Sequence, residues 1–88
     1  MGRNEKLQRL GRVLHISLSG KIILKAENLP HIGDKVLDEK LRPIGEVFDI
    51  FGPVSTPYIA VKAERKENNQ LINKILYFTS SRPRRRKK

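Results

Sequence analysis

The sequence lacks cysteine and tryptophan, and its aromatic residues are limited to three phenylalanines and two tyrosines. Without cysteine the chain can form no disulfide, no thiolate metal site and no thiol nucleophile, which is typical of a reducing intracellular compartment. No stretch approaches the roughly 18 consecutive apolar residues of a membrane-spanning helix. The N-terminal residues are polar and charged, without the apolar segment of a signal peptide. We therefore expect an intracellular protein without a membrane partner.

Patterns that carry catalysis are also missing. His15 and His31 are the only histidines, and their separation does not match the spacing of a histidine metal site. No serine lies in a G-x-S-x-G segment, and no glycine-rich phosphate loop occurs. We therefore predict that the protein is not an enzyme and that it holds no metal and no cofactor.

Acidic residues are few, with 9 Asp and Glu against 19 Lys and Arg and a net charge of +10. In so basic a chain we expect the carboxylates that could suggest acid–base chemistry to be solvated or ion-paired: Asp34, Asp38, Glu39, Glu46 and Asp49. Asp49 lies among apolar neighbours, and we expect its side chain to bond to the backbone rather than to take part in catalysis.

Positive charge is concentrated in the C-terminal tail, which holds six cations and no acid: Arg82, Arg84, Arg85, Arg86, Lys87 and Lys88. Residues 1–81 keep 13 Lys and Arg and 9 acids, so their net charge is only +4. The tail has nothing to bury, and we expect residues 80–88 to be disordered. Its cations can displace counterions from phosphates, which makes the tail a candidate RNA contact. Such contacts position an RNA without selecting its sequence.

Short segments in which apolar and polar residues alternate predict strands with one buried face. Between residues 9 and 18 the apolar face is predicted to be Leu10, Leu14, Ile16 and Leu18, opposite Val13. Ser19-Gly20 predicts a tight turn into a second strand over residues 21–26. Further strands are predicted at residues 36–37, 44–51, 58–63 and 74–78, separated by turns rich in Gly and Pro. This spacing predicts an all-β, closed or nearly closed barrel over residues 9–79, after a flexible N-terminus of residues 1–8.

The segment 44–51 is apolar on both predicted faces, with Ile44, Phe48 and Ile50 on one and Val47 and Phe51 on the other. The outer face of a small barrel is normally wet, so two apolar faces indicate that something covers the second one. Either a loop of the domain itself or a protein partner meets this requirement, and we favour the partner. The phenylalanines, Phe78 included, are interpreted as core or interface groups because five aromatics are few for an RNA-stacking sheet.

Three motifs follow one another in the same region. Ile32-Gly33-Asp34-Lys35-Val36 precedes the continuous run from Pro43 to Val54, which contains the segment IGEVFDIFGPV, and Pro57-Tyr58 follows. In this order and spacing they closely resemble the core of the glycine–arginine-rich protein subunit of H/ACA small ribonucleoproteins. The match extends more weakly from about Leu10 to Phe78.

The resemblance implies a six-stranded barrel of the reductase and elongation-factor type, docked on a dyskerin-like pseudouridine synthase. A subunit of this family is a non-catalytic accessory protein of RNA-guided rRNA pseudouridylation. It promotes loading and release of substrate RNA by biasing a mobile loop of the synthase. Its contact with the guide RNA and the other particle proteins is mainly indirect.

The resemblance also implies which residues contact the synthase: Gly45, Val47, Phe51, Gly52, Pro53, Val54, Pro57 and Tyr58. The sequence has no Gly-Arg-rich extension, which favours an archaeal-type, cytoplasmic form and gives no basis for a nucleolar address. The charge leaves one alternative, a ribosomal or translation-type barrel that binds RNA directly. An enzymatic function would require turnover without partners, and no residue suggests it.

Overall fold

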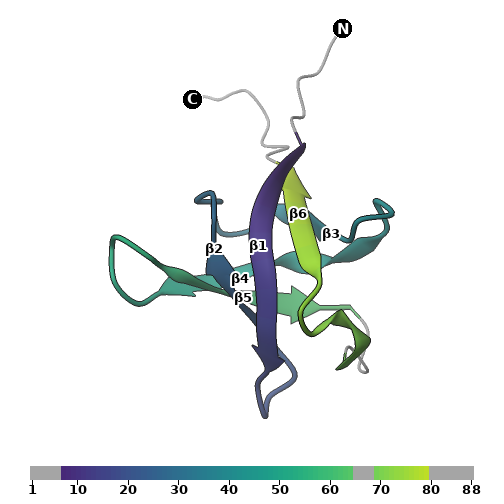
Figure 1. Cartoon of the computed structure of the whole chain (residues 1–88), viewed down its shortest axis with the longest axis horizontal. Helices are drawn as coiled ribbons and strands as arrows, with labels where there is room; N and C mark the ends of the chain where they lie inside the picture. Colours follow the sequence, from purple (N-terminus) through teal and green to yellow (C-terminus); the bar gives the residue numbers. More distant parts are fainter. Residues whose placement is uncertain (1–6, 65–68, 80–88) are drawn as a thin grey trace, which may run out of the picture.

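Six antiparallel strands close into a barrel in the order β1-β2-β5-β4-β3-β6 in the computed structural model, which describes residues 7–64 and 69–79 (Figure 1). The strands are β1 (Leu7–Ile16), β2 (Ile22–Ala26), β3 (Lys35–Leu37), β4 (Pro43–Phe51), β5 (Tyr58–Ala63) and β6 (Ile75–Thr79). One turn of 3-10 helix, η1 (Asn69–Leu71), precedes β6. The predicted six-stranded all-β barrel is thus confirmed, although β1 begins two residues before the predicted boundary. In the part of the chain that the structure describes, no helix is long and apolar enough to cross a membrane.

The barrel interior is filled by aliphatic side chains and one aromatic ring that alternate along the strands. In β2, Ile22 and Leu24 are buried while Lys25 is exposed, as the alternation predicts. The core consists of Leu10, Val13, Ile22, Leu24, Val36, Val47, Ile59, Val61, Leu71, Leu76 and Phe78. Phe78 is therefore a core residue.

The predicted inner face of β1 is partly wrong. Val13 is fully buried, whereas Leu14 is 43% exposed and Leu18 lies fully exposed in the turn after the strand. The pairing with β2 skips one residue between Val13 and His15, and the pairing with β6 skips one between Arg9 and Gly11. Each bulge adds a residue to one strand only and so reverses the inward and outward alternation beyond it.

A third bulge, between Val47 and Asp49, changes the faces of β4. Val47 is in the core and Ile44 and Ile50 pack against it, whereas Phe48 is 52% exposed and Phe51 44% exposed. Phe48 therefore does not share a face with Ile44 and Ile50, and Phe51 does not share one with Val47, contrary to prediction. The bulge makes both phenylalanines surface residues.

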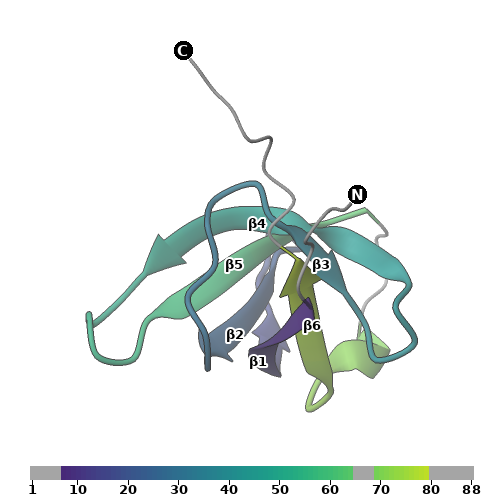
Figure 2. The same cartoon turned by 90° about the horizontal axis from the view of Figure 1, so that it is seen from above.

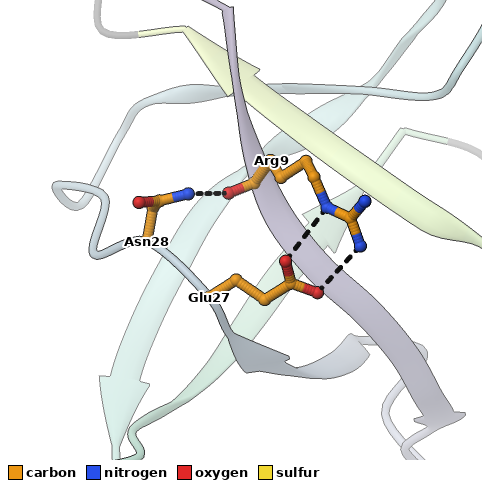
Figure 3. A network of polar contacts seen from close by, with 3 residues as sticks. All are labelled: Arg9, Glu27 and Asn28. Carbon is orange, nitrogen blue, oxygen red and sulfur yellow. Dashed lines mark hydrogen bonds and ion pairs between the residues drawn. The ribbon is translucent and has the colours of Figure 1, made fainter.

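The hairpin turn and the long connector are held by backbone and side-chain hydrogen bonds. Gly20 N donates to Ser17 O at 2.9 Å, which confirms the turn between β1 and β2. The connector leaves β2 at Glu27, whose carboxylate accepts two bonds from the Arg9 guanidinium at 3.0 and 3.1 Å (Figure 3). Asn28 Nδ2 donates to Arg9 O at 2.9 Å. The hydrogen bond from Arg9 to Glu27 raises the pKa of Arg9, and the network ties the connector to β1 beside its first bulge.

Among residues 7–64 and 69–79, the buried carboxylates are those of Asp34 and Asp38, and both shape loops. Asp34 Oδ2 accepts from His31 N at 2.9 Å, and Asp34 O accepts from Val47 N at 2.9 Å, which joins the connector to β4. Asp38 accepts from Lys40 N and Arg42 N at 2.9 Å and from Arg42 Nε at 3.0 Å. Burial by itself raises the pKa of Asp38, but these hydrogen bonds outweigh it, and the pKa is lowered.

The predicted behaviour of the acidic residues is met in part. Asp38 is buried but ion-paired with Arg42 as expected, whereas Asp34 is buried rather than solvated. Asp49 is exposed, and its Oδ1 accepts from Ile50 N at 2.8 Å, which confirms the expected bond to the backbone.

Candidate partner-docking surface

The end of the β4–β5 hairpin projects away from the barrel. It begins at Phe51, turns through residues 52–57 and returns at Tyr58. In both views the loop between these strands extends beyond the other elements, at the left of the picture (Figures 1 and 2). Residues 52–56 are exposed, and Val54 is 98% exposed. An apolar side chain is therefore presented at the far end of the molecule.

The base of this loop is stacked and tethered. Phe51 and Tyr58 are cross-strand partners, with ring centroids 5.8 Å apart and planes tilted by 30°. Gly52 has φ +93°, and a Cβ added there would lie 2.9 Å from Tyr58 Cδ2. The Gly52 backbone therefore packs on the Tyr58 ring at a position that only glycine occupies without strain. Pro57 O accepts from Ala26 N at 2.9 Å and anchors the loop to the end of β2.

Six of the eight predicted contact residues lie together at this hairpin end: Phe51, Gly52, Pro53, Val54, Pro57 and Tyr58. The other two belong to the barrel. Val47 is 1% exposed, inside the core. A Cβ on Gly45 would lie 2.0 Å from Lys62 O, so this glycine allows β4 and β5 to approach each other closely. Neither can present a side chain to a partner, and we no longer regard them as contact residues.

The tail cations lie outside the described residues: Arg82, Arg84, Arg85, Arg86, Lys87 and Lys88. The alternative in which a loop of the domain covers the outer face of β4 finds no support among residues 7–64 and 69–79. Phe48 and Phe51 remain about half exposed with all the described loops in place. The outer apolar face of β4 is therefore solvent-exposed in the part of the chain that the structure describes.

Residues 7–86 match the family model described as the Gar1/Naf1 RNA binding region. This chain belongs to that family. An uncharacterized protein of Methanothermobacter thermautotrophicus is 37% identical over 62 residues, which are 70% of this chain and 67% of that protein. Membership confirms the resemblance drawn from the three motifs. The Gar1/Naf1 family consists of accessory proteins of H/ACA ribonucleoproteins, with roles in RNA binding and ribosome biogenesis, and it is not a known catalytic family.

The sequence did not predict that Phe48 lies on the outer surface of the barrel in this Gar1/Naf1 domain. Lys21 Nζ sits 4.6 Å from the centre of the Phe48 ring, an arrangement that stabilises a cation over an aromatic face. Ala60, opposite the β4 bulge, is buried although it is not part of the core cluster. Only the bulge turns Phe48 outward, and no local pattern in the sequence indicates that bulge.

A separate cavity of about 300 Å³ lies at the start of β4, at the opposite end of that strand from the hairpin loop. It is lined by residues of the β3–β4 turn, the start of β4, η1 and the turn into β6, among them Asp38, Arg42, Ile44, Gln70 and Lys74. Asp38 and Arg42 already bond to each other there. Among the residues that the structure describes, no three His, Asp or Glu side chains gather into a metal-binding group.

Proposed function

We propose that this Gar1/Naf1-family protein is a non-catalytic accessory subunit that binds the pseudouridine synthase of an H/ACA ribonucleoprotein through its β4–β5 hairpin end. In this role it promotes loading and release of substrate RNA during guided pseudouridylation of rRNA. The observation that carries the proposal is the exposed apolar hairpin end, with Phe51 at 44% and Val54 at 98% exposure. Exposed apolar groups gathered at one place on a small domain are typical of a protein interface.

The hairpin end is well suited to binding because its shape is set in advance. Tyr58 is held between Phe51 and the Gly52 backbone, and Pro53 and Pro57 restrict the loop backbone. Little conformational freedom is then lost on association, which favours affinity. Aromatic side chains at such a position are common anchors of protein interfaces.

Charge supports a protein surface as the main contact. Residues 7–64 and 69–79 contain nine Lys and Arg and seven Asp and Glu, so this part of the chain is only slightly basic. Such a balance gives little general attraction for a polyanion. We infer that the barrel reaches guide and substrate RNA mainly through the synthase. This distinguishes the protein from a ribosomal or translation-type barrel that binds RNA directly.

The mechanism we propose is allosteric. A bound subunit shifts the equilibrium of a mobile synthase loop only as far as its contacts differ between the loop's two states. No residue of this protein then needs to touch the reacting base. Its effect is expected on substrate loading and release and not on the chemical step.

Calorimetry with the purified synthase subunit tests the proposed interface. We expect Phe51→Ala and Val54→Asp each to weaken binding by about 2 kcal/mol or more, roughly thirtyfold in Kd, because they remove central apolar anchors. Leu18→Asp is the matched control, since Leu18 is fully exposed in the β1–β2 turn. Its binding should equal that of the unsubstituted protein.

Reconstituted particles test the mechanism. The two hairpin variants should slow multiple-turnover pseudouridylation while leaving the single-turnover rate nearly unchanged. If both hairpin variants bind the synthase with wild-type affinity, the hairpin end is not the interface. An equal loss in single-turnover rate would remove the proposed role in loading and release.

A further inference from the structure

Four side chains form one row across the outer face of β1, β2, β5 and β4. The strand register pairs Arg12 with Lys25, Lys25 with Tyr58, and Tyr58 with Phe51. Directly paired residues of antiparallel strands point to the same face of a sheet. That face is the outer one, because Arg12, Lys25 and Phe51 are exposed, whereas Leu24 beside Lys25 and Ile59 beside Tyr58 are buried in the two middle strands. The row continues from the hairpin end onto the body of the barrel.

Two like charges stand side by side in this row. Arg12 and Lys25 are direct cross-strand partners, an arrangement that destabilises a sheet. The ion pairs found among residues 7–64 and 69–79 are Arg9–Glu27 and Arg42–Asp38, and neither includes Arg12 or Lys25. Within this part of the chain the repulsion is not relieved. An anionic group supplied from outside would relieve it.

The rest of the outer face favours a protein carboxylate over an RNA phosphate. Asp49 is the cross-strand partner of Ala60, so an acid lies on the same face one row further along, whereas in the next row Glu46 lies between Lys62 and Lys35. An RNA backbone following the sheet past this row would meet the Asp49 carboxylate. A partner carboxylate needs only the small area beside Lys25, and Tyr58 and Phe51 connect that area directly to the apolar hairpin end.

We propose that the docking surface extends from the hairpin end across β5 and β2 to Lys25 and Arg12. The partner surface then carries one or more carboxylates opposite these two cations, next to the apolar recess that receives Phe51 and Val54. This inference rests on the proposed function, because the partner is the synthase subunit. It adds the charge pattern that the synthase surface must present.

The two parts of the surface should act on different rate constants. Charges at the edge of an interface mainly set the association rate and its dependence on salt. Apolar anchors at the centre mainly set the dissociation rate. We therefore expect Lys25→Glu and Arg12→Glu each to slow association by about three- to tenfold at low salt and by less than about twofold at high salt. Phe51→Ala should instead speed dissociation.

Biolayer interferometry with the full chain and the synthase subunit, at low and at high NaCl, measures both rates. Lys40→Glu is the control, because it makes the same charge change in the β3–β4 turn at the other end of β4 and should keep wild-type kinetics. Thermal unfolding provides a folding check. Reversing one charge places opposite charges across the Arg12–Lys25 pair, so neither variant should melt below the wild type.

The outcomes separate this inference from the proposed function. Failure of the wild type to bind the synthase would remove both. Binding that weakens in Phe51→Ala, with association in Lys25→Glu and Arg12→Glu equal to that of Lys40→Glu at low salt, would overturn this inference alone. Fluorescence anisotropy with guide RNA tests the other possible anionic ligand of the row, the phosphate groups of RNA. If the two charge variants bind RNA tenfold more weakly and keep wild-type synthase kinetics, the row binds phosphate and the inference is wrong.

Discussion

Individual glycines of this barrel are required for different reasons. Gly45 sits where β4 crosses close to β5, and an added Cβ would lie 2.0 Å from Lys62 O. A backbone carbonyl cannot rotate away as a side chain can, so the strands themselves would have to separate. Gly20 has φ +89° in an open turn, where an added Cβ meets nothing within 4 Å. Substitution there is opposed only by the backbone conformation.

We predict that Gly45→Ala lowers the free energy of unfolding by about 3 kcal/mol or more, because it forces overpacking against the backbone. The control Gly20→Ala should cost about 1 kcal/mol, the penalty of a left-handed conformation. Urea denaturation of the two variants provides the comparison. Equal losses would show that the close approach of β4 and β5 is not needed for stability.

Bulges decide what each strand of this barrel presents to the core. The alternation of apolar residues predicted the strands correctly, but it placed Leu14 inside β1 and grouped Phe48 with Ile44 in β4. Both strands carry a bulge at or next to the misplaced residue. A one-residue insertion leaves both halves of a strand alternating, so the two halves look continuous in the sequence. The position of the bulge depends on the partner strand.

The bulge in β1 predicts losses of stability of different size for two adjacent residues. Val13→Ala should lower the free energy of unfolding by about 2 kcal/mol, since Val13 is fully buried. Leu14→Ala should cost less than about 1 kcal/mol, although it removes more carbon atoms, because Leu14 is 43% exposed. Chemical denaturation measures both. A larger loss for Leu14→Ala would mean that β1 keeps an unbroken alternation.

For the molecule as a whole, most of the net positive charge lies in the C-terminal tail, whereas the exposed apolar loop lies in the β4–β5 hairpin. Leu7 pairs with Thr79, so the described chain enters and leaves the barrel at one place, away from the β4–β5 hairpin (Figure 1). The six tail cations follow Thr79 in sequence, whereas the exposed apolar loop lies between β4 and β5. We expect separate partners for the two regions, RNA for the tail and protein for the hairpin.

Deletion of residues 82–88 tests this separation. Affinity for RNA should fall, and the slope of log K against log salt concentration should decrease by up to about five, because up to six phosphate contacts are lost. Binding to the synthase should stay at the wild-type level. Anisotropy titrations over a range of salt concentrations and calorimetry with the synthase give the two readouts. An unchanged salt slope, or weaker synthase binding, would contradict the assignment.

The candidate site was predictable where it depends on a local motif. The run from Phe51 to Tyr58 was identified from glycine, proline and aromatic residues that are close in sequence, and the structure brings six of the predicted residues together there. The same motif contains Val47 and Gly45, which are two residues apart on the inner face of β4 and are both buried in the barrel. The Lys21–Phe48 contact was not predictable, because it joins β2 to a bulge in β4.

The sequence by itself determined the all-β class, the strand and turn boundaries to within about two residues, the concentration of cations in the tail and the family of the protein. These properties depend on composition, on period-two alternation and on local motifs. Only the tertiary structure decided which side chains of β1 and β4 face outward and that Arg12, Lys25, Tyr58 and Phe51 form one row. The reason is physical: bulges and the strand order β1-β2-β5-β4 arise from pairing between segments far apart in the chain, and local alternation carries no information about those partners.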